Sequence, residues 1–187
     1  MKVTQTLCAI LACVWIAACA TSLPPPTATF DGIQQLRAAE IAPLALGDFT
    51  RAPELPEARD KSIAIRADSL QPPKGGTFSS FLRQTIEADL KGAGRLDPAA
   101  DRILSAQLTR SDISTFGSNS RGALGARFRV TQKSAIIFEK QVTVEEEWPS
   151  AFLGAVAITD ASNHYTGLYP KLWAALLADP EFRGAAR

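Results

Sequence analysis

The sequence has few of the residues that build disulfides, metal sites and catalytic centres. Its 187 residues include three cysteines and one histidine, His164. Cys8 and Cys13 lie in an N-terminal segment that we expect to be removed, which leaves Cys19 as the only mature cysteine. An intrachain disulfide is then excluded, and a metal site would rest on carboxylates, which no loop offers at calcium-type spacing. We expect no metal and no bound cofactor.

The chain also lacks an excess of either charge. It has 20 Lys and Arg against 19 Asp and Glu, a formal net charge of +1. Removal of the N-terminal segment takes Lys2 and no acidic residue, so that the mature chain is formally neutral. Nucleic-acid-binding domains and polybasic membrane surfaces need a basic excess. We therefore expect no nucleic acid partner and no attachment to anionic lipid through bulk charge.

No local sequence pattern supplies a catalytic site around His164. Residues 117–122 are rich in Gly and Ser, but they lack the lysine of a phosphate-binding loop and the G-x-S-x-G spacing of a nucleophile elbow. Residues 145–147 are three consecutive glutamates, which cannot all share one face of a strand. We expect a protein that is not an enzyme. A hydrolase is a disfavoured hypothesis, because it would need His164 beside a serine and a carboxylate in a cleft.

The N-terminus has the layout of a secretory signal peptide. Lys2 precedes an apolar run over residues 7–20, and small residues stand directly before a cysteine. The run is shorter than the about 20 residues that a transmembrane helix needs, and the polar, proline-rich residues 21–29 follow at once. The N-terminal segment therefore predicts a secreted protein rather than a membrane-spanning one.

Ile16-Ala17-Ala18-Cys19 resembles the lipobox of bacterial lipoproteins, in which an aliphatic and two small residues precede a cysteine. The resemblance implies that the signal peptide, residues 1–18, is removed and that Cys19 carries diacylglycerol and an N-acyl chain such as palmitate. Three acyl chains, at about 0.8 kcal/mol per buried CH₂, make release from a membrane negligible. Ala20 follows the cysteine instead of Asp, which in such lipoproteins implies the inner leaflet of a Gram-negative outer membrane, with the domain in the periplasm.

The mature chain is predicted to have two parts. Residues 19–32 contain the lipidated cysteine and three consecutive prolines, which favour an extended tether. At about 3.1 Å per residue, such a tether would hold the domain on the order of 35 Å from the bilayer. Residues 33–187 are of the size of a single periplasmic domain.

Apolar periodicity predicts the elements of this domain. Strands are expected over 41–49, where Pro43 indicates an edge strand or a later start, and over 62–66. A helix over 78–93 has apolar residues at spacings of three and four and is capped by Thr77. A strand over 102–113 and a polar loop over 114–122 follow.

A long antiparallel hairpin is predicted next, with strands over 123–131 and 135–148 and a turn at Gln132-Lys133. Residues 151–158 fit either a strand or a buried turn. A last helix over 159–178 is expected to be kinked at Pro170 or to begin near Tyr169. This order predicts an α+β fold, a sheet with a long antiparallel hairpin covered on one face by two helices.

The mature chain is similar to the periplasmic domains of outer-membrane accessory lipoproteins of the YajG type and the penicillin-binding-protein-activator type, and to the TolB amino-terminal type of fold. The similarity rests on the lipobox and on the segments 41–49, 78–94 and 102–108. It implies a role in the cell envelope beside a protein partner. None of these segments is a diagnostic functional motif, and no binding residue is transferred.

Two functions remain open. The first is an accessory or assembly factor that docks on an envelope protein. The alternative is a lipid-carrying or ABC-transport-auxiliary lipoprotein, which would need an apolar cavity of several hundred Å³. For docking, we select the glycine-rich loop and the charged strand after it, because loops on rigid sheets often carry function. The candidate partner-binding residues are Phe116, Asn119, Arg121, Arg127 and Arg129.

The same arginines also fit a solvated sheet face. Arg127 and Arg129 could pair with Glu139, Glu145 or Glu147 across the hairpin, at about 0.2–1 kcal/mol per pair. A solvated sheet face is the first interpretation of these charges, and a binding patch is the second.

Overall fold

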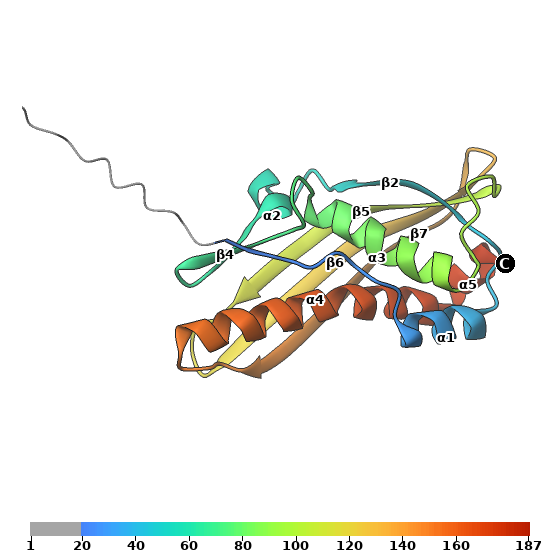
Figure 1. Cartoon of the computed structure of the whole chain (residues 1–187). Helices are drawn as coiled ribbons and strands as arrows, with labels where there is room; N and C mark the ends of the chain where they lie inside the picture. Colours follow the sequence, from blue (N-terminus) through green and yellow to red (C-terminus); the bar gives the residue numbers. More distant parts are fainter. Residues whose placement is uncertain (1–19) are drawn as a thin grey trace, which may run out of the picture.

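The computed structural model describes residues 20–187. The predicted signal peptide and the lipidation of Cys19 lie outside these residues. Within them the protein has two β-sheets and five helices, arranged as an elongated α+β domain with the helices on one side of the larger sheet (Figure 1). The predicted fold class is confirmed.

The larger sheet has four strands in the order β2-β5-β6-β7. β2 is parallel to β5, and the other neighbours are antiparallel. β2 is an edge strand and begins after Pro43, as predicted. The bounds are Ala45–Arg51 for β2, Arg102–Ser114 for β5, Asn119–Gln132 for β6 and Ala135–Pro149 for β7.

The hairpin of β6 and β7 is longer than predicted at both ends. β6 begins at Asn119, so that the predicted polar loop shrinks to a few residues between β5 and β6. The turn consists of Lys133 and Ser134, both with positive φ (49° and 69°), one residue later than predicted. Positive φ at both turn residues gives the turn a twist that matches the twist of the two strands of a tight hairpin.

The smaller sheet has three strands in the order β1-β4-β3. β1 runs parallel to β4, and β3 is antiparallel to β4. β3 confirms the predicted strand near residues 62–66 and contacts β5 of the larger sheet. The bounds are Ala20–Ser22 for β1, Ile63–Ile65 for β3 and Asp68–Gln71 for β4.

Two long helices cover one face of the larger sheet. α3 matches the predicted helix, and Thr77 and Ser80 form a reciprocal capping box at its start. α4 begins earlier than predicted and continues through Pro170, with Tyr169 before it and Leu172 after it both buried in the core. The helices are α1 (Phe30–Ala39), α2 (Glu57–Lys61), α3 (Phe78–Gly92), α4 (Gly154–Ala178) and α5 (Pro180–Ala186).

The core lies between these helices and the larger sheet. Alternate residues of β6, including Leu124 and Phe128, are fully buried, as the period-two pattern predicts. Aromatic rings from the two helices meet edge to face, with centroids 4.7 Å apart for Phe81 and Tyr169. Tyr165 also donates or accepts a hydrogen bond at 2.7 Å with the buried Ser111 hydroxyl. This layer is filled by side chains.

The structure contradicts the prediction of a free tether over residues 19–32, as far as it describes them. Residues 20–29, here called the strap, lie along the domain. β1 pairs with β4, and the buried Leu23 donates its N–H to the Gln71 carbonyl at 2.9 Å. Thr29 then caps α1. Backbone pairing and the burial of Leu23 hold the strap on the domain.

Two apolar segments are more exposed than the sequence suggests. Residues 151–158 were expected to be a strand or a buried turn, but Phe152 and Leu153 project into solvent and α4 begins at Gly154. Ile136 is two residues before the buried Phe138, a spacing that would place both on one face of a regular strand. A register shift between Val130 and Thr131 turns it outward.

Candidate functional site

The face of the larger sheet opposite to α3 and α4 carries no helix among the described residues, and we call it the open face. Strand side chains alternate between the two faces, so that the neighbours of the buried Leu104 and Phe128 point here. The side chains on the open face include those of Ile103, Ser105, Gln107, Arg127, Arg129, Ile136, Ile137, Glu139 and Gln141.

A hollow of about 380 Å³ lies on the open face where β2 meets β5. Its lining includes Gly47, Asp48, Gln107 and both Arg127 and Arg129. A Cβ at Gly47 would lie 2.9 Å from a methyl carbon of Ile103. The glycine therefore keeps this part of the hollow open, and the two arginines give it a polar wall.

Both arginines of the open face are engaged in ion pairs. Arg129 Nε donates to Glu139 Oε2 at 2.9 Å across the hairpin, and this bond lowers the pKa of Glu139 below its ordinary value. Arg127 Nη2 donates to Glu54 Oε1 at 2.8 Å, and its Nη1 donates to Gln107. The cross-hairpin interpretation is thus confirmed for Arg129. Arg127 instead reaches a residue on the loop between β2 and α2.

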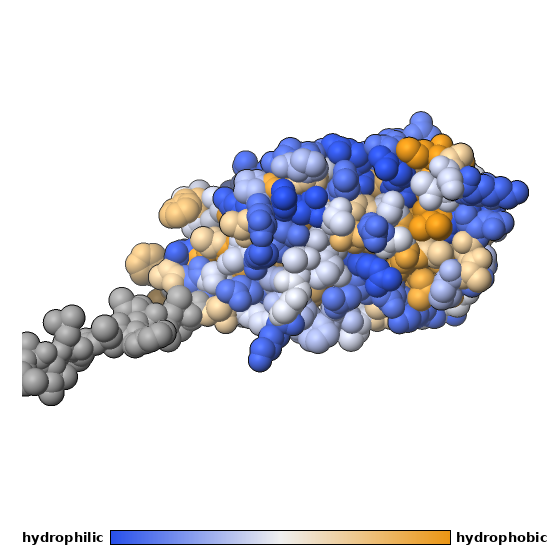
Figure 2. Space-filling model, turned by 90° about the horizontal axis from the view of Figure 1, so that it is seen from above, coloured by the Kyte–Doolittle hydropathy of each residue, from blue (hydrophilic) through white to orange (hydrophobic). Residues whose placement is uncertain are grey.

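Apolar side chains stand beside these charges. Ile103, Thr131 and Ile136 are aligned across β5, β6 and β7, and Ile137 is next to them. All three isoleucines are exposed. Figure 2 shows apolar side chains gathered at the end of the molecule remote from residue 20, and others next to the grey segment, with a largely hydrophilic surface between.

The structure does not bring the five predicted partner-binding residues together. Arg127 and Arg129 lie in the second half of β6, whereas Phe116, Asn119 and Arg121 lie before or near its start; Arg121 has the same parity as the two other arginines. Arg121 and Arg129 are on one strand, on the order of 25 Å apart at about 3.3 Å per residue. Asn119 and Arg121 both donate to Glu147, at 2.7 and 3.1 Å. The five residues are therefore spread along β6 and the loop before it, and their role as one docking surface stays a prediction.

His164 is held in place by contacts with a tryptophan and a glutamate. Its ring stacks on Trp148 with the centroids 4.3 Å apart, and its Nδ1 lies 3.0 Å from Glu146 Oε1. Lys171 binds the other oxygen of Glu146 at 2.8 Å. Burial alone would raise the pKa of Glu146, but the hydrogen bonds from Lys171 and His164 outweigh it and leave that pKa below its ordinary value. The described contacts of His164 include no serine.

From residue 20 onward, no three His, Cys, Asp or Glu side chains gather closely enough to hold a metal ion. No helix between residues 20 and 187 has both the length and the apolar character to cross a membrane.

Two further hollows bear on the lipid-carrier alternative. One of about 230 Å³ lies beneath the prolines of the strap, against Phe81 and Pro170. Another of about 390 Å³ lies between α1, α4 and α5, beside Ala39 and Leu177. Both open to solvent, and the space between the sheet and the long helices is filled by aromatic side chains.

Comparisons with known proteins concern the fold. No family model and no curated protein sequence matches the chain. A Xanthomonas campestris protein assigned to the family DUF330 is similar in structure, with a TM-score of 0.55 and 11% identity over 86% of this chain and 95% of that one. The two proteins therefore share a fold over most of both chains.

Two other solved structures are more distantly similar. A candidate lipoprotein from Caulobacter crescentus has a TM-score of 0.45 and 14% identity over 58% of this chain and 83% of that one. A minor lipoprotein from Acinetobacter baumannii has a TM-score of 0.39 and 10% identity over 74% of this chain and 94% of that one. These scores are too low to establish a common fold.

Proposed function

We propose that this protein is a non-catalytic accessory or assembly factor of a Gram-negative cell envelope, anchored by lipid on Cys19, whose open face docks a partner protein. The observation that carries the proposal is the open face itself. Long helices cover one side of the sheet, whereas the other side exposes three isoleucines beside paired arginines and a hollow. Apolar groups with a polar surround are typical of protein interfaces.

The edge of the sheet extends this surface. Among the described strands, β7 pairs only with β6, so that one side of a long strand presents free backbone groups. Such an edge can pair with a strand of another protein. Arg127 and Arg129 are partly exposed within their ion pairs, so that a partner carboxylate can compete for them.

The anchor and the location rest on the N-terminal sequence. The lipobox resemblance supports lipidation of Cys19, and Ala20 supports the inner leaflet of the outer membrane. The use of His164 in a stack on Trp148 and a hydrogen bond with Glu146 supports a role without catalysis. A palmitate label is expected on the wild-type protein and not on Cys19→Ala. An unlabelled wild-type protein would contradict the anchor.

Photo-crosslinking in intact cells tests docking on the open face. Gln141 of β7 and Gln84 of α3 are both exposed, and they lie on opposite sides of the domain. A photoreactive residue at Gln141 should capture one envelope protein, and the same residue at Gln84 should not. Capture from Gln84 alone, or from both positions equally, would contradict docking on the open face.

The lipid-carrying or ABC-transport-auxiliary function is the alternative. Extraction of the membrane-derived protein with a stoichiometric bound lipid, beyond the covalent acyl chains, would favour it over the docking factor.

A further inference from the structure

Four exposed apolar side chains gather at the end of the domain where residue 20 lies. Phe152 is 96% exposed, Phe116 81%, Leu153 65% and Val156 46%. We call these four residues the apolar tip. None of them contributes to the open face, and an isolated domain gains nothing from exposing two phenylalanines and a leucine to water.

Two loops form the tip, and backbone contacts hold them together. Phe116 is in the loop between β5 and β6, and the other three residues are between β7 and the first turn of α4. The Ser150 N–H donates to the Ser118 carbonyl at 2.9 Å. The hydroxyls of Ser120 and Ser150 lie 2.8 Å apart. The two loops therefore present one surface.

A third contact links the tip to the start of the described chain. Arg66, in the turn between β3 and β4, donates to the carbonyls of Ala151 and Phe152 at 2.7 and 3.3 Å. Next to that turn, Ser69 of β4 pairs with Ala20 of β1. Figure 1 shows that β1 begins at the same end of the molecule as α4. Consecutive Cα atoms are about 3.8 Å apart, so a lipid on Cys19 is attached at this end.

We propose that the apolar tip enters the interfacial region of the bilayer that holds the lipid of Cys19. This inference rests on the anchor of the proposed function. The strap is packed on the domain from Ala20 onward, with β1 paired and Leu23 buried, so no free tether lifts the described domain from the membrane. Aromatic and aliphatic side chains are stable at the headgroup and acyl boundary. The exposed guanidinium of Arg66 is suited to anionic headgroups.

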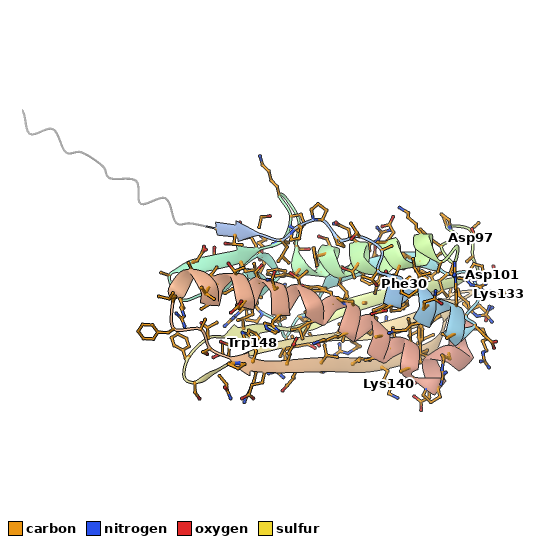
Figure 3. All side chains as sticks on the ribbon, turned by 60° about the horizontal axis from the view of Figure 1, so that its bottom comes forward. Phe30, Asp97, Asp101, Lys133, Lys140 and Trp148 are labelled. Carbon is orange, nitrogen blue, oxygen red and sulfur yellow. The ribbon has the colours of Figure 1, made fainter. Side chains whose placement is uncertain are left out.

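This contact sets the orientation of the domain. Lys133 in the β6–β7 turn, Asp97, Asp101 and Phe30 of α1 lie at the other end (Figure 3). That end then points into the periplasm, together with Ile136, which pairs with Thr131 beside the same turn. The open face stands roughly upright on the membrane and is accessible to a partner from the side.

Depth-dependent fluorescence quenching tests the proposal with the full-length, acylated protein. It is reconstituted into vesicles of phosphatidylethanolamine and phosphatidylglycerol whose acyl chains are brominated. The tryptophans of the mature protein, Trp148 and Trp173, are both buried, and the wild-type emission in each kind of vesicle is subtracted as the background. Phe152→Trp places a reporter in the tip. Phe30→Trp, at a residue that is 75% exposed at the far end, is the matched control.

The added emission of Phe152→Trp should be largely lost in brominated vesicles and retained in unbrominated ones, whereas that of Phe30→Trp should be the same in both. Equal emission of Phe152→Trp in both vesicles, with the protein floating with them, would overturn the tip contact and leave the anchor intact. Quenching at both positions would also overturn it, because the domain would then lie flat. Wild-type protein that does not float would refute the anchor instead.

Discussion

The backbone N–H of Thr29 donates to Asp89 Oδ1 at 2.8 Å, which joins the end of the strap to α3 across 60 residues of sequence. The Thr29 hydroxyl also donates to the same oxygen at 3.3 Å and accepts the N–H of Gly32 at 3.0 Å, as the N-cap of α1. One residue thus fixes the strap, α1 and α3 to one another. The position of the anchor relative to the domain depends on this junction.

Removal of the carboxylate should loosen the junction. Asp89 is buried, and Asp89→Ala would leave the Thr29 N–H without its acceptor. The free energy of unfolding should fall by about 1–3 kcal/mol, the cost of an unsatisfied buried donor. Asp89→Asn keeps an acceptor oxygen and should retain most of the stability. Denaturant unfolding measures both variants, and equal stability of the two would contradict this role for Asp89.

Asp89 should also make stability depend on pH. Burial raises the pKa of its carboxyl above the ordinary value, in spite of the hydrogen bonds from Thr29, and Oδ2 has no partner. Between the ordinary pKa of about 3.9 and the raised native pKa, the folded state binds more protons than the unfolded state. The contribution of Asp89 to stability therefore falls as pH rises through this window and is constant above it.

The comparison with Asp89→Asn isolates this effect. The stability of the wild type minus that of the variant should decrease as the pH is raised from about 4 and then become constant. Denaturant midpoints across this range measure it. A difference that grows with pH would show that the native pKa is lowered instead.

Gly32 should not tolerate a side chain. A Cβ there would lie 2.1 Å from Asp89 Oδ2, and Asp89 cannot move without losing Thr29. Gly32→Ala is expected to cost about 1–3 kcal/mol through overpacking. Gly184 in α5 has no atom within 4 Å of such a Cβ, so Gly184→Ala should be neutral or stabilise by up to about 1 kcal/mol. Equal thermal midpoints of the two variants would refute the close approach of Gly32 and Asp89.

His164 should be dispensable for function but not for stability. His164→Ala removes the stack on Trp148 and the bond to Glu146, which together should cost on the order of 1–2 kcal/mol. When His164→Ala replaces the wild-type protein in the native bacterium at normal protein levels, it should complement the loss of the protein and leave the envelope function unchanged. Loss of function in a variant that is as stable as the wild type would restore the hydrolase hypothesis.

Elements whose signals are local were predictable from the sequence. The alternation of Leu124 and Phe128 defined β6 and its buried face, and Thr77 defined the start of α3. These patterns record which side of an element is buried, and they need no knowledge of the partner. The class of the fold followed from their order.

The packed strap and the exposed apolar residues near Phe152 depended on distant partners and were missed. β1 forms only because β4 lies beside it, and Asp89 gives no sequence sign that it binds Thr29. Residues 151–158 have the composition of a core segment, yet Phe152 is at the tip, because composition does not report exposure. Nearness in sequence suggested one docking surface, whereas the length of β6 spreads the five residues apart.

Binding of the partner captured from Gln141 tests docking on the open face most directly. Ile137→Glu places a charge among the exposed isoleucines of that face, and Phe30→Glu places the same charge on an exposed apolar residue of α1. Both variants should unfold like the wild type, because neither side chain is buried. Ile137→Glu should weaken partner binding by about tenfold or more, equivalent to about 1.4 kcal/mol, with Phe30→Glu unchanged. Unchanged binding by Ile137→Glu, or equal weakening by both variants, would contradict the account.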